Sequence, residues 1–179
     1  MKLSLAPALI ALTLCAAPAV AALPVGAEAP LFKTKVSLAG KEMPFDLAKA
    51  LKAGPVVLYF YPAAFTTGCT IEAHDFAEAT DDFRRLGATV IGVSADPIDV
   101  LDKFSVTECR NKFAVASATP QMIADYDVKL ATTARANRTS YVIVPDGRVI
   151  FAYSAMDPSG HVAKAIDALR AWQGSHDHP

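Results

Sequence analysis

The strongest constraint on the fold is an unbroken apolar run over residues 56–61, which leads directly into a short loop ending at Cys69. Its residues are β-branched, aromatic or leucine, and such a run is typical of a central strand covered on both faces. Sheets of this kind belong to α/β domains, in which ligands bind beyond the carboxyl ends of the strands. The sequence therefore predicts an α/β fold with a functional site in the loop after residue 61.

Candidate helices and strands alternate along the rest of the chain. We expect helices at 47–52, from Cys69 to Leu86 with Gly87 as the C-terminal cap, from Pro97 to Phe104, at 121–126 and from Ser159 to Leu169. Strands are expected at 89–93 and at 114–116. Two further strands, at 141–144 and 149–151, are expected to form a hairpin with a turn at Pro145, Asp146 and Gly147. Asp46, Asp96 and Ser159 are expected to cap helices. Helical crossovers favour parallel pairing of the early strands, so we expect a mixed central sheet flanked by helices.

The first 22 residues have the pattern of a secretory signal peptide. Lys2 supplies a positive charge, residues 3–14 are largely apolar, and small residues surround a cleavage position at Ala21 or Ala22. We therefore expect residues 1–22 to be removed and the protein to be secreted, into the periplasm.

The alternatives to secretion have specific weaknesses. A membrane anchor would need roughly 20 apolar residues, and this segment is shorter and contains Pro7, so we expect no stable membrane insertion. A lipoprotein modified at Cys15 would require a small residue before it, where Leu14 stands. We expect one domain over 23–179, with residues 172–179 as a frayed tail whose histidines do not form a metal site.

Charge and cysteine content narrow the function further. The formal net charge of −1 provides no basic stripe for a phosphate backbone, so no nucleic acid is expected as a partner. Removal of the leader leaves two thiols, Cys69 and Cys109, which lie 40 positions apart and fit neither a C-x-x-C motif nor a metal-ligand spacing. In an oxidising compartment such a pair can form a disulfide.

Cys69 is expected in the first turn of a helix. Unpaired backbone N–H groups and the positive end of the helix dipole favour the thiolate there, which is the nucleophilic form of cysteine. The alternative is that Cys69 is a small buried hydrophobic residue, as free cysteines often are. Position alone leaves both interpretations open.

The residues around Cys69 resemble a known signature. Pro62, Thr66 and Cys69 match the P-x-x-x-T-x-x-C motif of peroxiredoxins, which are thiol peroxidases with a thioredoxin-like fold. The longer run Val-Leu-Tyr-Phe-Tyr-Pro-x-x-Phe-Thr-x-Gly-Cys-Thr resembles the peroxiredoxin Q branch, also called bacterioferritin comigratory protein. The likeness covers residues 26–172, and Arg138 resembles the active-site arginine of the family.

The resemblance implies a role for each of these residues. Cys69 would attack one oxygen of a hydroperoxide and become a sulfenic acid, without metal, haem, flavin or other cofactor. Thr66 would offer its hydroxyl, Gly68 would allow close approach of backbone N–H groups, and Arg138 would serve sulfur and oxygen together. Pro62 would shield the pocket from water.

Each residue also has a structural explanation. Thr66 could cap the helix, Pro62 could end the strand, and Arg138 could pair with a carboxylate such as Asp146. Glu72 could either orient Arg138 or lie in solvent. Their joint occurrence in register with Cys69 favours the catalytic interpretation.

The second thiol is expected to resolve the sulfenic acid. Many relatives carry a cysteine five residues after the nucleophile, where this chain has His74. Other members of the branch place it in the region of Cys109, which leads us to expect an intramolecular Cys69–Cys109 disulfide. The alternative is an inert Cys109 and direct reduction of Cys69 by an external thiol.

The expected function is a thiol-dependent peroxidase that acts on hydrogen peroxide or organic hydroperoxides. A thioredoxin-like or other thiol would serve as reductant, and by analogy with the branch the protein would be a monomer. The competing function is a thiol–disulfide oxidoreductase of thioredoxin type, against which the missing C-x-x-C motif counts.

Overall fold

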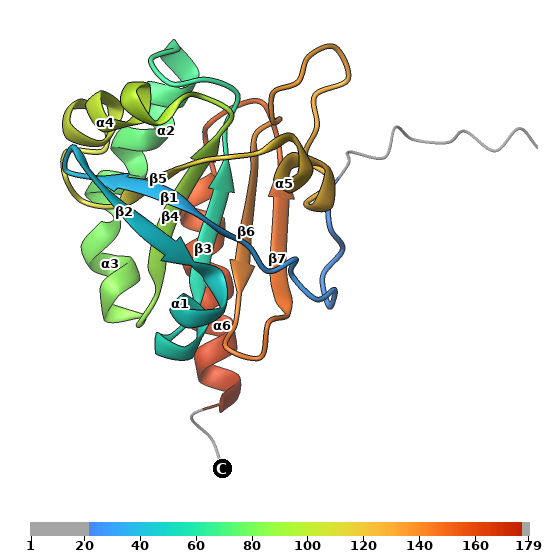
Figure 1. The fold of residues 1–179 in the computed structure, drawn as a ribbon. Helices are drawn as coiled ribbons and strands as arrows, with labels where there is room; N and C mark the ends of the chain where they lie inside the picture. Colours follow the sequence, from blue (N-terminus) through green and yellow to red (C-terminus); the bar gives the residue numbers. More distant parts are fainter. Residues whose placement is uncertain (1–21, 177–179) are drawn as a thin grey trace, which may run out of the picture.

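The computed structural model describes residues 22–176, so the expected leader, apart from Ala22, lies outside the described residues. A sheet in the order β2-β1-β5-β4-β3-β6-β7 forms the centre of the molecule (Figure 1). Its strands are β1 (Lys33–Leu38), β2 (Lys41–Asp46), β3 (Val56–Phe60), β4 (Thr89–Ser94), β5 (Ala114–Ser117), β6 (Thr139–Ile143) and β7 (Val149–Ser154). The helices are α1 (Leu47–Ala53), α2 (Thr67–Glu78), α3 (Thr80–Arg85), α4 (Ile98–Thr107), α5 (Pro120–Asp125) and α6 (His161–His176).

The central strand is the one that the apolar run predicts. Every residue of β3 is buried, and β3 pairs in parallel with β4 and antiparallel with β6. β4 in turn pairs in parallel with β5, so the expected parallel pairing of the early strands is confirmed. The hairpin β6–β7 is confirmed as well. The prediction of a mixed α/β sheet flanked by helices is therefore correct.

Alternate residues of β3 supply the two layers of the core. Val57 and Tyr59 face a cluster that includes residues of α2, α3, α4 and α6. Val56, Leu58 and Phe60 face the other cluster, which includes residues of α1 and α5. Because each face of the strand meets helices, the run had to be apolar throughout rather than alternating. The loop that leads to Cys69 begins at the end of this strand.

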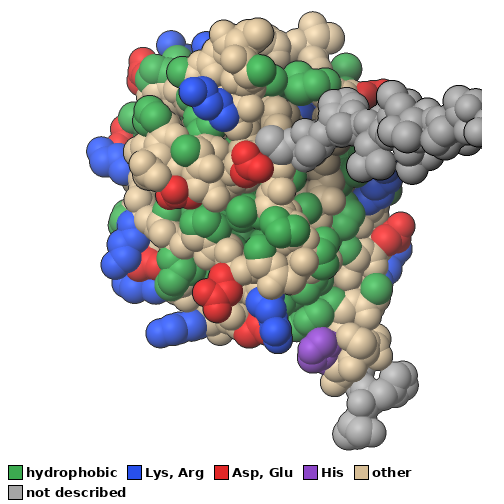
Figure 2. All heavy atoms as spheres, turned by 90° about the vertical axis from the view of Figure 1, so that its right-hand side faces the viewer, with side chains coloured by type: hydrophobic (Ala, Val, Ile, Leu, Met, Phe, Trp, Pro, Cys, Tyr) green, Lys and Arg blue, Asp and Glu red, His purple; other side chains and the backbone are tan. Residues whose placement is uncertain are grey.

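Residues 26–29, which precede β1, pair with the start of the edge strand β7. Gly26 N donates to Val149 O at 2.8 Å, Val149 N donates to Ala27 O at 2.9 Å, and Ala29 N donates to Gly147 O at 2.8 Å. This side of the molecule is shown in Figure 2, where apolar side chains form a band and charged ones lie around it. Among residues 22–176, no helix is both long and apolar enough to cross a membrane.

The sequence analysis did not predict the first hairpin, β1–β2. β2 is the edge strand and is mostly exposed, and the two strands together carry three lysines and few buried apolar residues. The turn uses left-handed backbone at both Ala39 (φ 53°) and Gly40 (φ 73°). Alanine at such a position gives no turn signal, because L-residues with a Cβ rarely adopt it.

Several expected helix ends were wrong. The helix expected to begin at or near Cys69 does so, at Thr67, but it is interrupted at Ala79, between α2 and α3, instead of continuing to Leu86. Asp96 does not cap α4, because Pro97 has extended backbone and is itself the N-cap. Ser159 donates its hydroxyl to Asp157 at 2.7 Å instead of capping α6. By contrast, Asp46 caps α1 as expected, accepting from Lys49 N.

The expected frayed tail is helical over most of its length. α6 continues to His176, and Gln173 Nε2 donates to Leu86 O at 3.0 Å, which ties the helix end to the turn after α3. Residues 177–179 lie outside the described part of the chain.

Gly92 in β4 permits the tight packing of Tyr59 on β3. A Cβ at residue 92 would lie 2.8 Å from the Tyr59 hydroxyl oxygen. We therefore expect Gly92→Ala to lower the free energy of unfolding by about 1–3 kcal/mol, measured by urea denaturation. Gly174→Ala is the control, since nothing lies within 4 Å of that position and alanine favours helix. Equal stability of the two variants would contradict this account.

Candidate active site

The loop after β3 places Cys69 in the first turn of α2. Its side chain is almost fully buried, with 1% of the residue exposed. Thr66 is the N-cap, yet its hydroxyl makes no capping bond to the helix and donates to Ala63 O at 3.0 Å. The structure therefore does not support the alternative that Thr66 serves only as a cap. The first backbone N–H groups of α2 have no intrahelical partner, which makes this helix end favourable for negative charge.

An aspartate and an arginine that the sequence analysis did not assign to the site hold the loop in place. Asp96 accepts from Ala64 N at 2.7 Å, and Arg135 Nη1 donates to Asp96 at 3.1 Å. The same Arg135 nitrogen donates to Pro62 O at 3.0 Å. Asp96 was misread as a helix cap because Asp-Pro is the usual signature of one. Arg135 carried no local signal, since its partners are remote in sequence.

The loop also contains backbone strain. Phe65 has φ 64°, in the left-handed region that residues with a Cβ seldom adopt. Its exposed ring packs edge-on against Phe104 of α4, with ring centroids 5.2 Å apart. Together with Asp96 and Arg135, this contact fixes the loop between Pro62 and Thr66. Such strain persists only where the surroundings determine the conformation.

Arg138 joins Cys69 to the rest of the site. It directly precedes β6 and is 3% exposed. Its Nη2 donates to Cys69 Sγ at 3.5 Å, its Nε donates to Met156 O at 3.0 Å, and its Nη1 is paired with Glu72. Burial lowers the pKa of Arg138, but the charges of Glu72 and Cys69 raise it overall, so the guanidinium stays charged.

Asp146, the alternative partner that the sequence suggested for Arg138, is excluded by its own contact. Asp146 in the β6–β7 turn pairs with Arg148 at 2.8 Å. Glu72, whose role the sequence left open, is fully buried and orients the guanidinium. Gly68 lies directly beside it, because a Cβ there would come within 3.0 Å of Arg138 Nη2.

Behind Glu72 lies a buried histidine that the sequence analysis did not identify. His161 Nε2 donates to Ala155 O at 3.1 Å, because a carbonyl oxygen can only accept. In the neutral imidazole, Nδ1 therefore accepts from the Ser140 hydroxyl at 2.8 Å. Nδ1 also lies 3.6 Å from Glu72 Oε1, a buried oxygen with no hydrogen-bond donor among the described residues.

Burial sets the charges of this inner pair. It raises the pKa of Glu72 to about 8, against the lowering effect of Arg138. Burial, together with smaller effects of the charges of Arg138 and Lys164, lowers the pKa of His161 to about 4. His161 is therefore neutral at neutral pH. It holds the Ala155 carbonyl, which adjoins the Met156 carbonyl that receives Arg138.

The second thiol lies in the same core layer as the first. Cys109 follows α4, is fully buried, and belongs with Cys69, Tyr59 and Tyr61 to the cluster under α2 and α4. Burial raises the pKa values of Tyr59 and Tyr61 well above the usual range. Both cysteines are free thiols here. Burial strongly raises the pKa of Cys109, so it stays protonated in this conformation.

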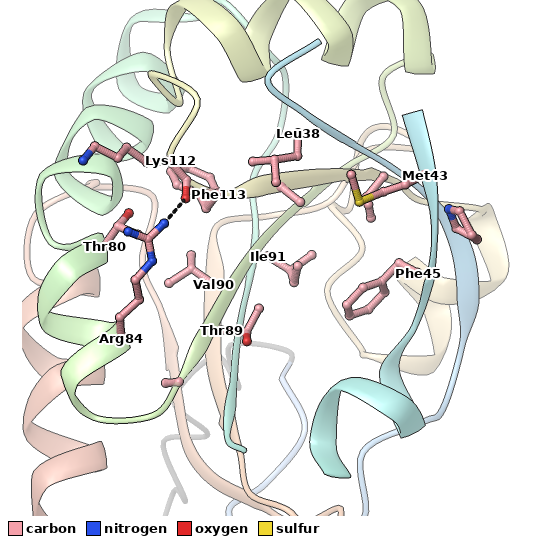
Figure 3. A pocket seen from close by; sticks show the side chains of 14 residues that line it. Leu38, Met43, Phe45, Thr80, Arg84, Thr89, Val90, Ile91, Lys112 and Phe113 are labelled. Carbon is pink, nitrogen blue, oxygen red and sulfur yellow. Dashed lines mark hydrogen bonds between the residues drawn. The ribbon is translucent and has the colours of Figure 1, made fainter. Parts of the chain in front are cut away.

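A separate cavity of about 290 Å³ lies away from Cys69, between the β1–β2 hairpin and α3 (Figure 3). Its lining is mainly apolar and includes neither Cys69, Thr66 nor Arg138. Over residues 22–176, no group of three or more histidine, cysteine, aspartate or glutamate side chains is placed to hold a metal ion.

Comparison with known proteins agrees with this geometry. Residues 25–152 match the model of the AhpC/TSA family. The chain belongs to this family. It is 35% identical over 132 residues to a peroxiredoxin from Mycobacterium tuberculosis, which covers 72% of this chain and 86% of the relative. The Bcp peroxiredoxin of Helicobacter pylori strain J99 is 31% identical over 161 residues, covering 82% and 98% of the two chains.

Solved structures show the same fold. The crystal structure of the M. tuberculosis peroxidoxin BcpB superposes with a TM-score of 0.75 and 32% identity, covering 82% of this chain and 96% of that one. Enterococcus faecalis AhpC gives a TM-score of 0.77 at 20% identity, covering 86% and 95%. The thioredoxin-like fold is thus confirmed, and the chain is a peroxiredoxin of the Bcp type with thiol-dependent peroxidase activity.

The buried histidine makes the stability of this peroxiredoxin depend on pH. The unfolded chain takes up a proton at His161 below about pH 6.5, and the folded chain does so only near pH 4. The contribution of the neutral His161 to the free energy of unfolding is therefore complete above pH 6.5. It is lost as the pH falls to about 4, by an amount on the order of 3 kcal/mol. We expect His161→Gln to reduce the difference in unfolding free energy between pH 7 and pH 4.5.

The control for this measurement is His176→Gln, which changes an exposed histidine at the end of α6. It should leave the pH difference as in the wild type. An unchanged difference in His161→Gln would show that the imidazole is not held neutral by the fold.

Proposed function

We propose that this peroxiredoxin reduces hydrogen peroxide or an organic hydroperoxide at Cys69. The observation that supports this assignment is the position of the buried Arg138 guanidinium, 3.5 Å from Cys69 Sγ at the start of α2. The thiolate attacks one peroxide oxygen, the O–O bond breaks, and the other oxygen leaves as hydroxide or alkoxide and takes a proton. Cys69 becomes a sulfenic acid.

The proposed roles of the other residues follow from their contacts. The Thr66 hydroxyl donates to Ala63 O, so its lone pairs are available to accept a hydrogen bond from the hydroperoxide. The backbone N–H groups at Gly68 and Cys69 and the Arg138 fork face the oxygen on which charge develops. Pro62 has no N–H and its carbonyl is bound by Arg135, so it contributes a rigid, weakly hydrated wall.

We further propose that Cys109 resolves the sulfenic acid as an intramolecular disulfide with Cys69. The mature chain has no other thiol, and both cysteines lie in one core layer. A disulfide requires their Cα atoms to approach within about 7 Å. Because Cys109 is buried and protonated, its segment must move before it can react. Arg110 (φ 50°) and Asn111 (φ 59°) place strained left-handed backbone directly after it.

The completed cycle needs an external reductant. A dithiol of thioredoxin type would reduce the disulfide, with its two electrons and two protons restoring both thiols. The direct reduction of Cys69 by an external thiol remains the competing route to be tested. We also propose that the protein acts as a monomer.

The sequence pattern of the leader supports secretion into the periplasm as the site of action. An intact mass measured on protein from the periplasmic fraction tests this proposal. A mature chain beginning at Ala22 or Leu23 is expected, and a full-length chain confined to the cytoplasm would contradict it.

The assignment of the two thiols predicts different defects. Cys69→Ser should abolish peroxide consumption with dithiothreitol, because the nucleophile is lost. Without dithiothreitol, Cys109→Ser should consume one equivalent of peroxide rapidly and leave a sulfenic acid that dimedone traps. After one equivalent of peroxide, the wild type should lose two hydrogens by mass under non-reducing conditions. A stable dimedone adduct in the wild type would refute resolution by Cys109.

The fork of Arg138 predicts a further result. Arg138→Lys should lower the second-order rate constant for Cys69 oxidation by about 10²-fold, because one ammonium group cannot serve Cys69, Glu72 and the Met156 carbonyl together. The control is Arg148→Lys in the exposed β6–β7 turn, which should react like the wild type. Equal rates for the two variants would exclude Arg138 from the reaction.

A further inference from the structure

The segment that carries Cys109 is attached to α2 and α3 by a row of polar contacts. His74 Nε2 lies 2.9 Å from Glu108 Oε2, and Arg110 Nη1 lies 3.0 Å from Glu78 Oε1. These two pairs join α2 to the residues on either side of Cys109. The row therefore brackets the buried thiol.

Two contacts from α3 extend the row to Lys112. Arg84 Nη2 donates to the Lys112 carbonyl at 3.3 Å, as Figure 3 shows, and Lys112 Nζ lies 4.0 Å from Asp81. We call His74, Glu78, Asp81 and Arg84 the tether row. Residue numbers increase in the same direction in α2 and α3 as in the segment 108–112 that they contact. The contacts therefore hold this segment in one register.

The tether row joins groups that the peroxidase mechanism does not otherwise use. His74 and Glu78 are four residues apart in α2 and so lie on one face of the helix. Glu108 is negatively charged and contacts His74, which has the complementary charge when it is protonated. Arg110 is positively charged and contacts the negatively charged Glu78. A coincidental surface pair would not explain two matched contacts on either side of one buried cysteine.

We propose that the tether row restrains the Cys109 segment and thereby sets the rate at which Cys109 reaches the oxidised Cys69. This proposal rests on the Cys69–Cys109 disulfide proposed above. His74 and Glu78 act as positioning residues, through Glu108 and Arg110, and do not touch the reacting atoms. The strained backbone at Arg110 and Asn111 favours release, and the row opposes it.

The restraint decides between two reactions of the sulfenic acid. In the first, Cys69–SOH and Cys109–SH form a disulfide and one water molecule. In the second, another hydroperoxide transfers an oxygen to Cys69–SOH, which becomes a sulfinic acid while the hydroperoxide becomes an alcohol or water. A slower release of Cys109 leaves more time for the second reaction. The tether row would therefore set the sensitivity of the enzyme to excess peroxide.

The test uses the full mature chain and rapid mixing with hydrogen peroxide. Glu78→Gln and Glu108→Gln should each speed formation of the Cys69–Cys109 disulfide about two- to fivefold, the range expected for the loss of one ion pair at the protein surface. The rate of Cys69 oxidation should not change, because neither residue touches the site. The sulfinic fraction after a large excess of peroxide, measured by mass, should fall accordingly.

A charge exchange separates electrostatic restraint from general loosening. Glu78→Arg alone should speed disulfide formation, and the same change combined with Arg110→Glu should bring the rate back toward that of the wild type. Asp167→Asn, which removes an exposed pair with Arg170 on α6, is the control and should have no effect. If the exchanged variant stays as fast as Glu78→Arg, the pair does not act as a restraint.

The outcomes distinguish the two levels of the proposal. If the wild type forms no intramolecular disulfide, the role of Cys109 in the proposed function fails, and the tether row fails with it. If the disulfide forms at the same rate in the wild type and in all tether variants, only the tether row is overturned.

Discussion

The site depends on one buried positive charge. The Arg138 guanidinium is almost fully buried, and such a charge is costly unless its surroundings compensate for it. Here Glu72 of α2, the Met156 carbonyl after β7 and Cys69 share its donors. This single side chain therefore joins the start of β6 to α2 and to the segment after β7. Removing any one of these partners would leave a buried donor of the guanidinium unpaired, which is costly.

The two cysteines are held in contrasting ways. The loop before Cys69 is fixed by the buried Asp96 carboxylate and by Arg135, so the sulfur of Cys69 and the donors around it are already held in place. The segment around Cys109 contacts α2 through one part-buried and one exposed ion pair, which are individually weak. The proposed cycle needs both properties, because its first step requires fixed geometry and its second step requires Cys109 to move.

Local patterns predicted much of the fold. The apolar run identified β3, the Pro-Asp-Gly turn identified the β6–β7 hairpin, and Asp46 marked the start of α1 correctly. The β1–β2 hairpin was missed because an edge hairpin buries little apolar surface and its turn uses an alanine at positive φ. Asp96 was misassigned for a related reason, since its actual partners, Ala64 and Arg135, lie 32 and 39 residues away along the chain.

The sequence by itself determined the strand, the loop and the helix start that carry Pro62, Thr66 and Cys69, because these residues are neighbours in the chain and their chemistry is local. Only the tertiary structure decided which groups surround the sulfur. Arg138 meets Glu72 across 66 residues, and His161 meets Ser140 across 21, through contacts that sequence spacing does not specify. Burial changes the protonation of such groups, and burial exists only once the sheet and its helices have packed.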